Sequence, residues 1–362
     1  GFLGAGKTTS VARLAQHLTD RGLKVGLITN DQGRELVDTA LLRSRGFATE
    51  EIPGGCFCCR FQSLVEAAQR LTETTRPDIF MAEPVGSCTD LIATVSYPLR
   101  RIYGEQFSIA PLSVLVDPVR ALRVFGLETG GKFSDKVLYI YRKQLEEADL
   151  IVINKTDLLD PQRLSELQRL LRTEFQQAEV LSVSARTAAG LAEWFERILD
   201  TEQSSRMAMP IDYEVYADGE SLLGWLNATI HISGPAEFDA NELLRNVAIE
   251  IQQRLQMERA EIAHLKMTFS PQDAGLNEIA AVNLVRSDFI PELSQTLEES
   301  VRTGQLIVNL RAEAAPAILN AALRDAMASV SQNDDGIAAR IEHIEHFRPG
   351  KPQPTHRLTS VL

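Results

Sequence analysis

The sequence lacks any apolar run long enough to cross a membrane, which would need about 18 or more consecutive apolar residues. It also lacks the signal-peptide pattern of a charged start, an apolar middle and a small-residue cleavage site. We therefore expect a cytoplasmic protein that has no membrane partner.

Positive charge is also scarce. Lys and Arg number 37 and Asp and Glu number 49, which gives a formal net charge of -12. Proteins bind nucleic acids largely through basic surfaces, so this balance disfavours a nucleic-acid partner. Local positive sites are compatible with the same balance.

Cysteine is rare, and its distribution is uneven. Three of the four cysteines, Cys56, Cys58 and Cys59, fall within four residues. Cysteines this close together cannot form a disulfide framework that joins distant loops. The cluster therefore indicates a chemical role for its thiols.

Hydrophobic residues make up 44% of the 362 positions, which is enough for a sizeable core and for two domains. Short apolar runs lie at 23–28, 77–82, 112–116, 150–153 and 180–183, and helical patterns lie between them at 10–19, 61–71 and 162–175. Apolar strands separated by helices are typical of a mostly parallel sheet with helices on both faces. The first part of the chain therefore predicts an α/β fold.

The second part of the chain has a different pattern. Strand-like stretches lie around Glu214 and at 225–232, 262–269, 279–285 and 306–310, and helices are expected at 239–257 and 316–330. This predicts a smaller C-terminal α+β domain. We expect the first domain at 1–200 without its first strand, a linker at 201–211, the second domain at 212–347 and a proline-rich tail at 348–362.

The segment Gly1-Phe-Leu-Gly-Ala-Gly-Lys-Thr-Thr9 fits the phosphate-loop pattern G-x-x-x-x-G-K-[ST] and precedes a helix. Its glycines let backbone N–H groups surround the α- and β-phosphates of a nucleotide. Lys7 reaches the β- and γ-phosphates, and the Thr8 hydroxyl can bind Mg²⁺. The residues expected to contact the nucleotide here are Gly1, Gly4, Ala5, Gly6, Lys7, Thr8 and Thr9.

The segment Asn154-Lys155-Thr156-Asp157 follows the strand at 150–153 and indicates guanine recognition. A carboxylate at Asp157 can accept hydrogen bonds from guanine N1–H and the exocyclic amine, a pair that adenine does not offer. Ser184 and Ala185 follow the next strand, where a backbone amide can bind the guanine carbonyl. We therefore predict GTP rather than ATP, bound by Asn154, Lys155, Asp157, Ser184 and Ala185.

The cysteine cluster lies in Gly54-Gly-Cys-Phe-Cys-Cys59, where three thiols can supply soft ligands to Zn²⁺ or another late transition metal. A redox pair and simple burial are the alternatives. With a strand at 48–52 and a helix from Phe61, the cysteines lie in a βα loop at the carboxyl edge of the sheet, beside the phosphate loop. Cys88 lies near the same edge and could complete the metal shell, but a packed thiol is the favoured interpretation.

Acidic residues follow two other strands at this edge. Asp31 and Asp38 come after the strand at 23–28, and Glu83 comes after the strand at 77–82. Such carboxylates can hold Mg²⁺ or orient the attacking water, or they are solvated loop acids. The candidates are Lys7, Glu83 and Asp38 for catalysis, Thr8 and Asp38 for Mg²⁺, and Gly86 for an amide contact to the γ-phosphate.

Together these motifs resemble the CobW/HypB/UreG family of P-loop GTPases, most closely its CobW-like branch. The resemblance covers about residues 1–200 and rests on the phosphate loop, Asn30-Asp-Gln-Gly33 with Asp38, the cysteine cluster, Glu83 with Gly86, and Asn154 to Asp157. It implies a slow GTPase that binds Zn²⁺ or Co²⁺ and delivers the metal to a client protein, which the C-terminal domain helps to choose.

The sequence therefore predicts a GTP-hydrolysing metallochaperone or metal insertase that uses GTP, Mg²⁺ and Zn²⁺ or Co²⁺ and serves a client metalloenzyme. A regulatory GTPase switch with structural or redox-active cysteines is the alternative, and a small-molecule kinase is a third. Three thiolates leave a coordination shell that a second subunit could complete, so a homodimer is compatible with the sequence. The six histidines are scattered, unlike the histidine-rich stretch of many relatives, which argues against metal storage.

Overall fold

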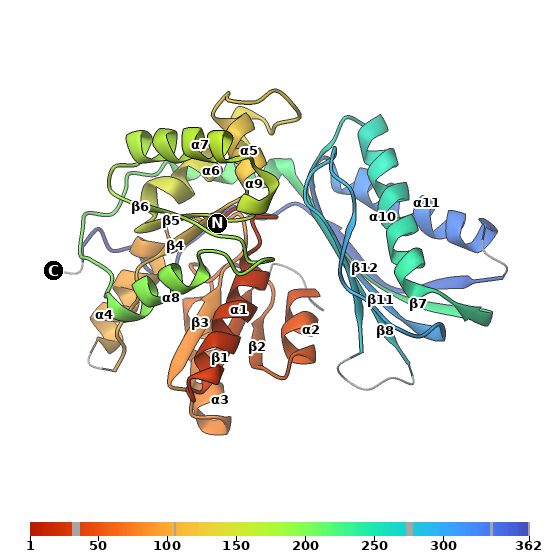
Figure 1. Ribbon diagram of the computed structural model, residues 1–362, viewed down its shortest axis with the longest axis horizontal. Coiled ribbons are helices and arrows are strands. Elements are labelled where there is room, and N and C mark those ends of the chain that lie inside the picture. The colour runs from red at the N-terminus through yellow and green to blue at the C-terminus, as the bar shows by residue number, and fades with distance from the viewer. Residues whose placement is uncertain (31–36, 105, 273–277, 334–335, 361–362) are drawn as a thin grey trace. The chain divides into compact units, whose positions relative to one another are not determined.

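Figure 1 shows the computed structural model of the chain, which describes residues 1–30, 37–104, 106–272, 278–333 and 336–360. The chain forms two compact units. The first unit comprises Gly1–Asn30, Glu50–Glu220 and Lys351–Leu362, and the second comprises Asp31–Thr49 and Ser221–Gly350. Each unit is therefore assembled from segments that are far apart in the sequence.

Six strands before residue 183 form two three-stranded sheets, ordered β2-β1-β3 and β4-β5-β6. β1 pairs in parallel with β3, and β5 pairs in parallel with β4 and β6. β1 and β5 are buried along their whole length, as expected for strands covered on both faces. The predicted α/β class is confirmed. The strands are β1 (Val25–Asn30), β2 (Ala48–Ile52), β3 (Ile79–Glu83), β4 (Ser113–Val116), β5 (Leu150–Ile153) and β6 (Glu179–Ser182).

The helices of the first unit start at local sequence signals. Asp117 and Asp160 begin two of them, because each carboxylate accepts a hydrogen bond from the backbone N–H three residues later and a proline follows. The helices are α1 (Lys7–Asp20), α3 (Phe61–Thr74), α4 (Tyr97–Tyr103), α5 (Pro118–Val124), α6 (Asp135–Glu147), α7 (Pro161–Glu174), α8 (Leu191–Asp200) and α9 (Tyr213–Leu222). A π-helical turn at Ile92–Ser96 precedes α4, and a 3₁₀ turn lies at Thr156–Leu158.

The second unit contains a six-stranded antiparallel sheet ordered β10-β9-β8-β11-β7-β12. Its strands are β7 (Leu223–Phe238), β8 (Glu261–Pro271), β9 (Ala280–Leu284), β10 (Glu292–Gln295), β11 (Val301–Glu313) and β12 (Ala338–Phe347). Its helices are α2 (Val37–Ser44), α10 (Ala240–Met257) and α11 (Pro316–Asn333). The predicted C-terminal α+β arrangement is confirmed.

The core of the second unit lies between its sheet and two helices. α10 and α11 pack side by side on one face of the sheet (Figure 1). Leu244 and Val247 of α10 belong to the same buried cluster as Leu265 and Met267 of β8. The helical spacing in α10 and the two-residue alternation in β8 therefore turn both sets of apolar side chains toward one core.

The strand expected around Glu214 is wrong, because this segment forms α9. The Asp212 carboxylate accepts hydrogen bonds from the backbone N–H groups of Glu214 (2.9 Å) and Val215 (3.2 Å), which is a helix cap. Tyr216 and Glu220 then lie one turn apart and are both buried. Capping and burial on one face therefore outweigh the strand propensity of the tyrosines and valine here.

None of the helices in the described part of the chain has the length and apolarity that a membrane crossing requires.

Candidate functional site

The phosphate-loop segment at residues 1–6 has a backbone that requires glycine at two positions. Gly4 and Gly6 have φ angles of 79° and 90°, in the left-handed region where glycine is favoured. A Cβ atom on Gly6 would also lie 2.4 Å from Nδ2 of Asn154. Gly6 is the residue before α1, so the N–H groups of the first helical turn follow directly. This arrangement suits the binding of an anion.

Lys7, Thr8, Glu83 and Gly86 come together at the start of α1. The Thr8 hydroxyl donates a hydrogen bond to Oε1 of Glu83 at 3.1 Å, and both side chains are buried. A Cβ atom on Gly86 would lie 3.0 Å from Nζ of Lys7, so the Gly86 backbone lies against the lysine amine. The structure thus places a hydroxyl, a carboxylate, a cation and a backbone segment in one small region.

The loop at 154–157 is tied to the phosphate loop by side-chain hydrogen bonds. Asn154 Nδ2 donates to the carbonyl of Ala5 at 3.0 Å, and Asn154 Oδ1 accepts from the N–H of Ala185 at 3.0 Å. Lys155 adopts φ 57° and donates from Nζ to the carbonyl of Gly4 at 2.7 Å. Asn154 therefore joins three loops that are distant in sequence.

Asp157 lies beside the loop that follows β6. The Ser184 hydroxyl donates to Oδ1 of Asp157 at 2.5 Å, and the Arg186 guanidinium lies 3.9 Å from Oδ2. The Asp157 side chain is 22% exposed, so its carboxylate is accessible to a ligand. An accessible carboxylate held by a hydroxyl is suited to accept two N–H donors from a base.

Asp117 is a residue of this region that the sequence did not single out. Its carboxylate lies 2.8 Å from Nζ of Lys155, and its side chain is 3% exposed. The local sequence shows only its capping role, as an Asp that precedes Pro118 and begins α5. Its ion pair with Lys155 depends on the neighbouring position of β4 and β5 in the sheet, which no local pattern reveals.

The cysteine cluster lies in the loop between β2 and α3, and we call residues 54–59 the thiol loop. The loop turns back on itself, since the N–H groups of Cys59 and Arg60 both donate to the carbonyl of Cys56, at 3.0 and 2.9 Å. Asn30, at the end of β1, donates from Nδ2 to the carbonyls of Ile52 (2.9 Å) and Gly55 (2.6 Å). The end of one strand thus anchors the loop that follows the next.

The three sulfur atoms of the thiol loop are close enough to share one metal ion. Sγ of Cys56 lies 2.8 Å from Sγ of Cys58 and 3.3 Å from Sγ of Cys59, and the third separation is 3.7 Å. Ligands on a tetrahedral zinc ion with Zn–S bonds of about 2.3 Å are about 3.8 Å apart. Small side-chain rotations would therefore convert this cluster into three ligands of one ion. Cys56 and Cys58 are buried, and Cys59 is half-buried.

The hydrogen bonds within the thiol loop concentrate negative charge on one sulfur. Hydrogen bonds from the thiols of Cys58 and then Cys59 hold the pKa of Cys56 well below its usual range. The same hydrogen bond to Cys56 raises the pKa of Cys58, and the Cys56 contact raises the pKa of Cys59 to about 11.

The proline-rich tail packs on the thiol loop within the first unit. The N–H of Gln353 donates to Sγ of Cys59 at 3.2 Å. Thr355 donates from its backbone N–H to the carbonyl of Cys58 at 2.9 Å and from its hydroxyl to the carbonyl of Cys59 at 3.2 Å. The His356 ring packs edge-on against Phe61. Sequence patterns alone had no signal for this contact, because it joins segments almost 300 residues apart.

The predicted role of Asp38 receives no support from its surroundings within the second unit. Asp38 lies in α2, and its two carboxylate oxygens lie 2.5 and 2.8 Å from Nζ of Lys266. The backbone N–H of Val37 donates to Asn309 Oδ1 at 3.0 Å, which holds the start of α2 on the sheet of this unit. The assignment of Asp38 to Mg²⁺ and catalysis stays a prediction. Asp31, Gln32 and Gly33 lie outside the described residues.

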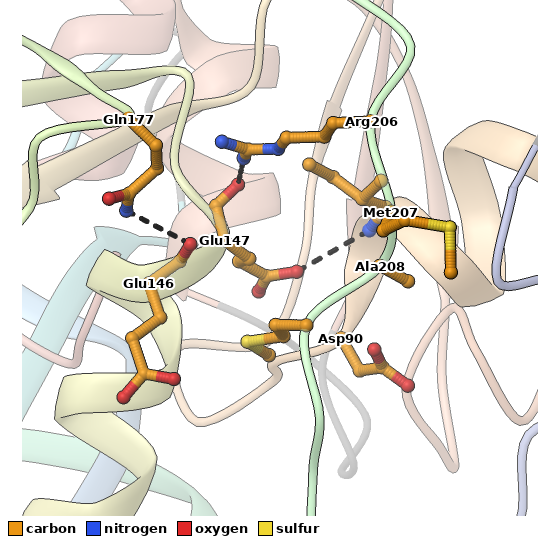
Figure 2. Close-up of a pocket in the computed structure, with 9 residues that line it drawn as sticks. Asp90, Glu146, Glu147, Gln177, Arg206, Met207 and Ala208 are labelled. Atoms are coloured by element: carbon orange, nitrogen blue, oxygen red, sulfur yellow. Dashed lines mark hydrogen bonds between the residues drawn. The ribbon is translucent and has the colours of Figure 1, made fainter.

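A cavity of about 200 Å³ lies elsewhere in the first unit, and Figure 2 shows its lining. Two buried carboxylates, Asp90 and Glu147, border it together with the apolar side chains of Met207 and Met209. Glu147 accepts hydrogen bonds from the Thr89 hydroxyl (3.2 Å) and the backbone N–H of Ile92 (3.4 Å). Burial, and then the nearby Asp90 carboxylate, raise the pKa of Glu147 to about 8.

Replacing Glu147 by Gln is expected to increase stability at pH 8 and to change it little at pH 5. Between the ordinary pKa of 4.5 and the folded-state pKa of about 8, only the unfolded chain loses this proton as the pH rises. The free energy of unfolding therefore falls across this window by about 1.4 kcal/mol per pH unit. The amide does not titrate, so the variant loses this slope.

Thermal unfolding between pH 5 and pH 8 checks this expectation. The matched control is Glu146→Gln, which changes the adjacent, more exposed carboxylate and is expected to keep the wild-type slope. A wild-type slope in Glu147→Gln would contradict the expectation.

The fold and the site geometry define the class of this protein. A glycine-rich loop at the start of a helix, a Thr–Glu pair beside a lysine, and the loop at 154–157 hydrogen-bonded to the glycine-rich loop are typical of a P-loop nucleotide-binding domain. Residues 1–182 match the nucleotide-binding domain of CobW/HypB/UreG, and the chain belongs to this family. The predicted family is confirmed.

Two proteins of similar sequence are named zinc chaperones. The zinc chaperone YeiR of Escherichia coli (strain K12) is 32% identical over 172 residues, which cover 47% of this chain and 48% of YeiR. The zinc chaperone CobW of Sinorhizobium sp is 34% identical over 181 residues, which cover 44% of this chain and 50% of that protein. The chain thus spans about half the length of the curated relatives it matches.

Among solved structures, the Zn(II)-bound YjiA GTPase from E. coli aligns with 90% of this chain and 96% of its own, at 12% identity and a TM-score of 0.35.

Proposed function

We propose that this protein is a GTP-hydrolysing metallochaperone that binds Zn²⁺ or Co²⁺ at its thiol loop and delivers the metal to a client protein. The observation that carries this proposal is the cluster of Cys56, Cys58 and Cys59, whose sulfur atoms all lie within 4.8 Å of one another. The names of YeiR and CobW as zinc chaperones support it.

The nucleotide part of the proposal rests on two groups of contacts. Lys7 and the N–H groups that follow Gly6 would bind the phosphates, and the Thr8–Glu83 pair would hold Mg²⁺, which would neutralise phosphate charge. Asp157 would accept the N–H groups of guanine, and the N–H of Ala185 would donate to the guanine carbonyl. Asn154 would hold the loop at 154–157 in place against the phosphate loop and the loop after β6.

The metal part of the proposal rests on the chemistry and burial of the thiols. Thiolates select soft or borderline cations such as Zn²⁺ and Co²⁺ over Mg²⁺. Three protein ligands leave one position of a tetrahedral ion open, which favours transfer over permanent storage. The ion is thus the cargo of the protein, and the client would take it at the open position.

The two sites are connected through the ends of neighbouring strands. Asn30 ends β1 and holds the thiol loop, while Glu83 ends the adjacent β3 and contacts Thr8. A movement at the end of β3 on GTP hydrolysis can therefore be transmitted through the neighbouring strand β1 to the thiol loop. We infer that nucleotide state controls metal affinity.

The proposal is tested by measuring Zn²⁺ and Co²⁺ affinity through chelator competition, first with Mg²⁺ and a non-hydrolysable GTP analogue and then with Mg²⁺ and GDP. We expect the affinity to be about 5- to 150-fold lower with GDP, the usual range for coupled sites. Lys7→Ala, which weakens phosphate binding, should show no difference between the two nucleotides.

Each contrary outcome has a distinct meaning. Equal affinities in the two nucleotide states would refute metal delivery and leave a GTPase that happens to bind metal. No metal binding in either state would favour a regulatory GTPase switch whose cysteines are structural or redox-active.

A further inference from the structure

The chain segment at 351–358, which we call the strap, lies on the thiol loop within the first unit. The N–H of Gln353 donates to Sγ of Cys59, and the Thr355 hydroxyl donates to the Cys59 carbonyl. The N–H of Thr355 donates to the carbonyl of Cys58. Cys59 is half-buried, whereas the other two thiols of the loop are buried. The strap therefore covers the side of the cluster that is closest to solvent.

The sequence of the strap explains how its backbone meets the sulfur. Gln353 stands between Pro352 and Pro354, and proline has no N–H. Gln353 thus supplies the one N–H of this triplet, and that N–H donates to Sγ of Cys59 at 3.2 Å. The fixed φ angles of the two prolines reduce the conformational entropy that the chain loses when the strap is ordered. The proline-rich composition therefore favours the ordered strap.

The far end of the strap is held by an ion pair, which we call the latch. Nε of Arg357 donates to Oδ2 of Asp90 at 2.8 Å, and the same oxygen accepts from the Tyr213 hydroxyl at 2.7 Å. Asp90 is 1% exposed and has a φ of 65°, which is uncommon for a residue with a side chain. The N–H of Leu358 donates to the carbonyl of Ala93 at 2.9 Å. A buried, fixed carboxylate thus holds the strap in place.

We propose that the strap closes the metal site: it covers the bound ion while Arg357 pairs with Asp90, and it detaches before the ion enters or leaves. The inference rests on the proposed function and adds a segment that is distant from the thiol loop in sequence. The N–H of Gln353 would orient the Cys59 sulfur toward the ion, as hydrogen bonds to ligand atoms do in metal sites.

The latch decides how often the strap is open. The hydrogen bonds between the strap and the thiol loop are made by neutral donors, whereas the latch joins a guanidinium to a carboxylate. Charge-assisted hydrogen bonds are about twice as strong as neutral ones. Loss of the latch therefore raises the open fraction of the strap more than loss of any one of the other contacts.

Closure has a direct consequence for transfer of the ion. Under a closed strap, the ion is shielded from competing ligands in solution. When the strap detaches, Cys59 is the first thiol that a client ligand reaches, because the other two are buried. Displacement of the strap is thus a step of metal delivery.

The test compares the wild-type chain with Arg357→Met and Arg357→Lys. Iodoacetamide is added to the metal-free chain, and peptide mass spectrometry measures the rate of alkylation at Cys59. The release of Zn²⁺ to a colorimetric chelator is measured on the loaded chain. Arg357→Met is expected to increase both rates by about 10- to 100-fold, the usual effect of losing a hydrogen bond to a charged group. Arg357→Lys keeps the charge and should stay within about fivefold of wild type.

A second pair of variants avoids an uncompensated carboxylate at Asp90. Thr355→Val removes the hydroxyl that donates to the Cys59 carbonyl and keeps the shape of the side chain. It should increase both rates by about fivefold, as expected for one neutral hydrogen bond. Thr359→Val is the matched control, because it makes the same change at an exposed position just beyond the strap. It should retain the wild-type rates. Thermal unfolding and GTP titration check that each variant is folded.

The outcomes separate the inference from the proposed function. Wild-type alkylation rates in folded Arg357→Met and Thr355→Val would overturn the strap. Faster alkylation without faster Zn²⁺ release would also overturn it, because the strap would then cover the thiols without controlling the metal. If the wild-type chain binds no Zn²⁺ while alkylation responds as expected, the metal part of the proposed function fails and the cover over the thiols is supported.

Discussion

Replacing Asp157 by Asn is expected to lower the affinity for GTP by about 10²- to 10⁴-fold, because two guanine donors lose a suitable acceptor. Guanine presents N1–H and an exocyclic amine, and a carboxylate can accept from both. An amide offers one acceptor and one donor, which matches xanthine, where an oxygen replaces the amine. The variant should therefore gain affinity for xanthosine triphosphate. Isothermal titration calorimetry with both nucleotides measures the change.

The matched control for this substitution is Asp160→Asn. Asp160 lies three residues further on and accepts a hydrogen bond from the N–H of Arg163 at the start of α7. Asn is as good a helix cap as Asp, so this control should retain both stability and GTP affinity. In Asp157→Asn, the Ser184 hydroxyl can still donate to the remaining oxygen, which preserves the loop. Unchanged GTP affinity in Asp157→Asn would refute guanine recognition by this residue.

Replacing Cys56, Cys58 and Cys59 together by Ser is expected to weaken Zn²⁺ binding by at least about 10³-fold. A serine hydroxyl is a harder and far less acidic donor than a thiol, so it does not replace a thiolate ligand. GTP affinity should stay within about twofold of wild type, because the phosphate and base loops retain all their residues. Chelator competition and calorimetry on the same sample measure the two affinities.

The matched control for the triple substitution is His356→Ala. It removes an exposed imidazole that packs on Phe61, at the end of the thiol loop, and leaves every thiol in place. We expect wild-type Zn²⁺ affinity in this control. Wild-type Zn²⁺ affinity in the triple variant would show that the metal binds elsewhere and would refute the thiolate site.

Local patterns in the sequence predicted the strands and the glycine conformations of the first unit well. The apolar runs at 150–153 and 180–183 became β5 and β6 to within a residue, and the segment at 48–52 became β2. Such runs depend on burial along a few consecutive residues, which is a local property. Gly4 and Gly6 are likewise local signals of a left-handed backbone conformation, because only glycine adopts it at low cost.

The same local signals failed where distant parts of the chain decide the outcome. The segment around Glu214 became a helix because Asp212 caps it and because Tyr216 and Glu220 are buried. The ion pair between Asp38 and Lys266, a residue 228 positions away, likewise has no local signal in the sequence, and the assignment of Asp38 to Mg²⁺ stays a prediction. An acidic side chain in a sequence shows that a cation will be attracted to it but does not identify which cation is near.

By itself, then, the sequence determined the parallel α/β class, the glycine-rich phosphate-loop motif and the presence of three thiols within four residues. Only the tertiary structure decided that Asp117 pairs with Lys155 and that residues 353–355 bind the thiol loop. The physical reason is the range of each interaction. Backbone conformation and strand burial depend on neighbouring residues, whereas hydrogen bonds and ligand sets depend on which strand ends and loops the fold brings together.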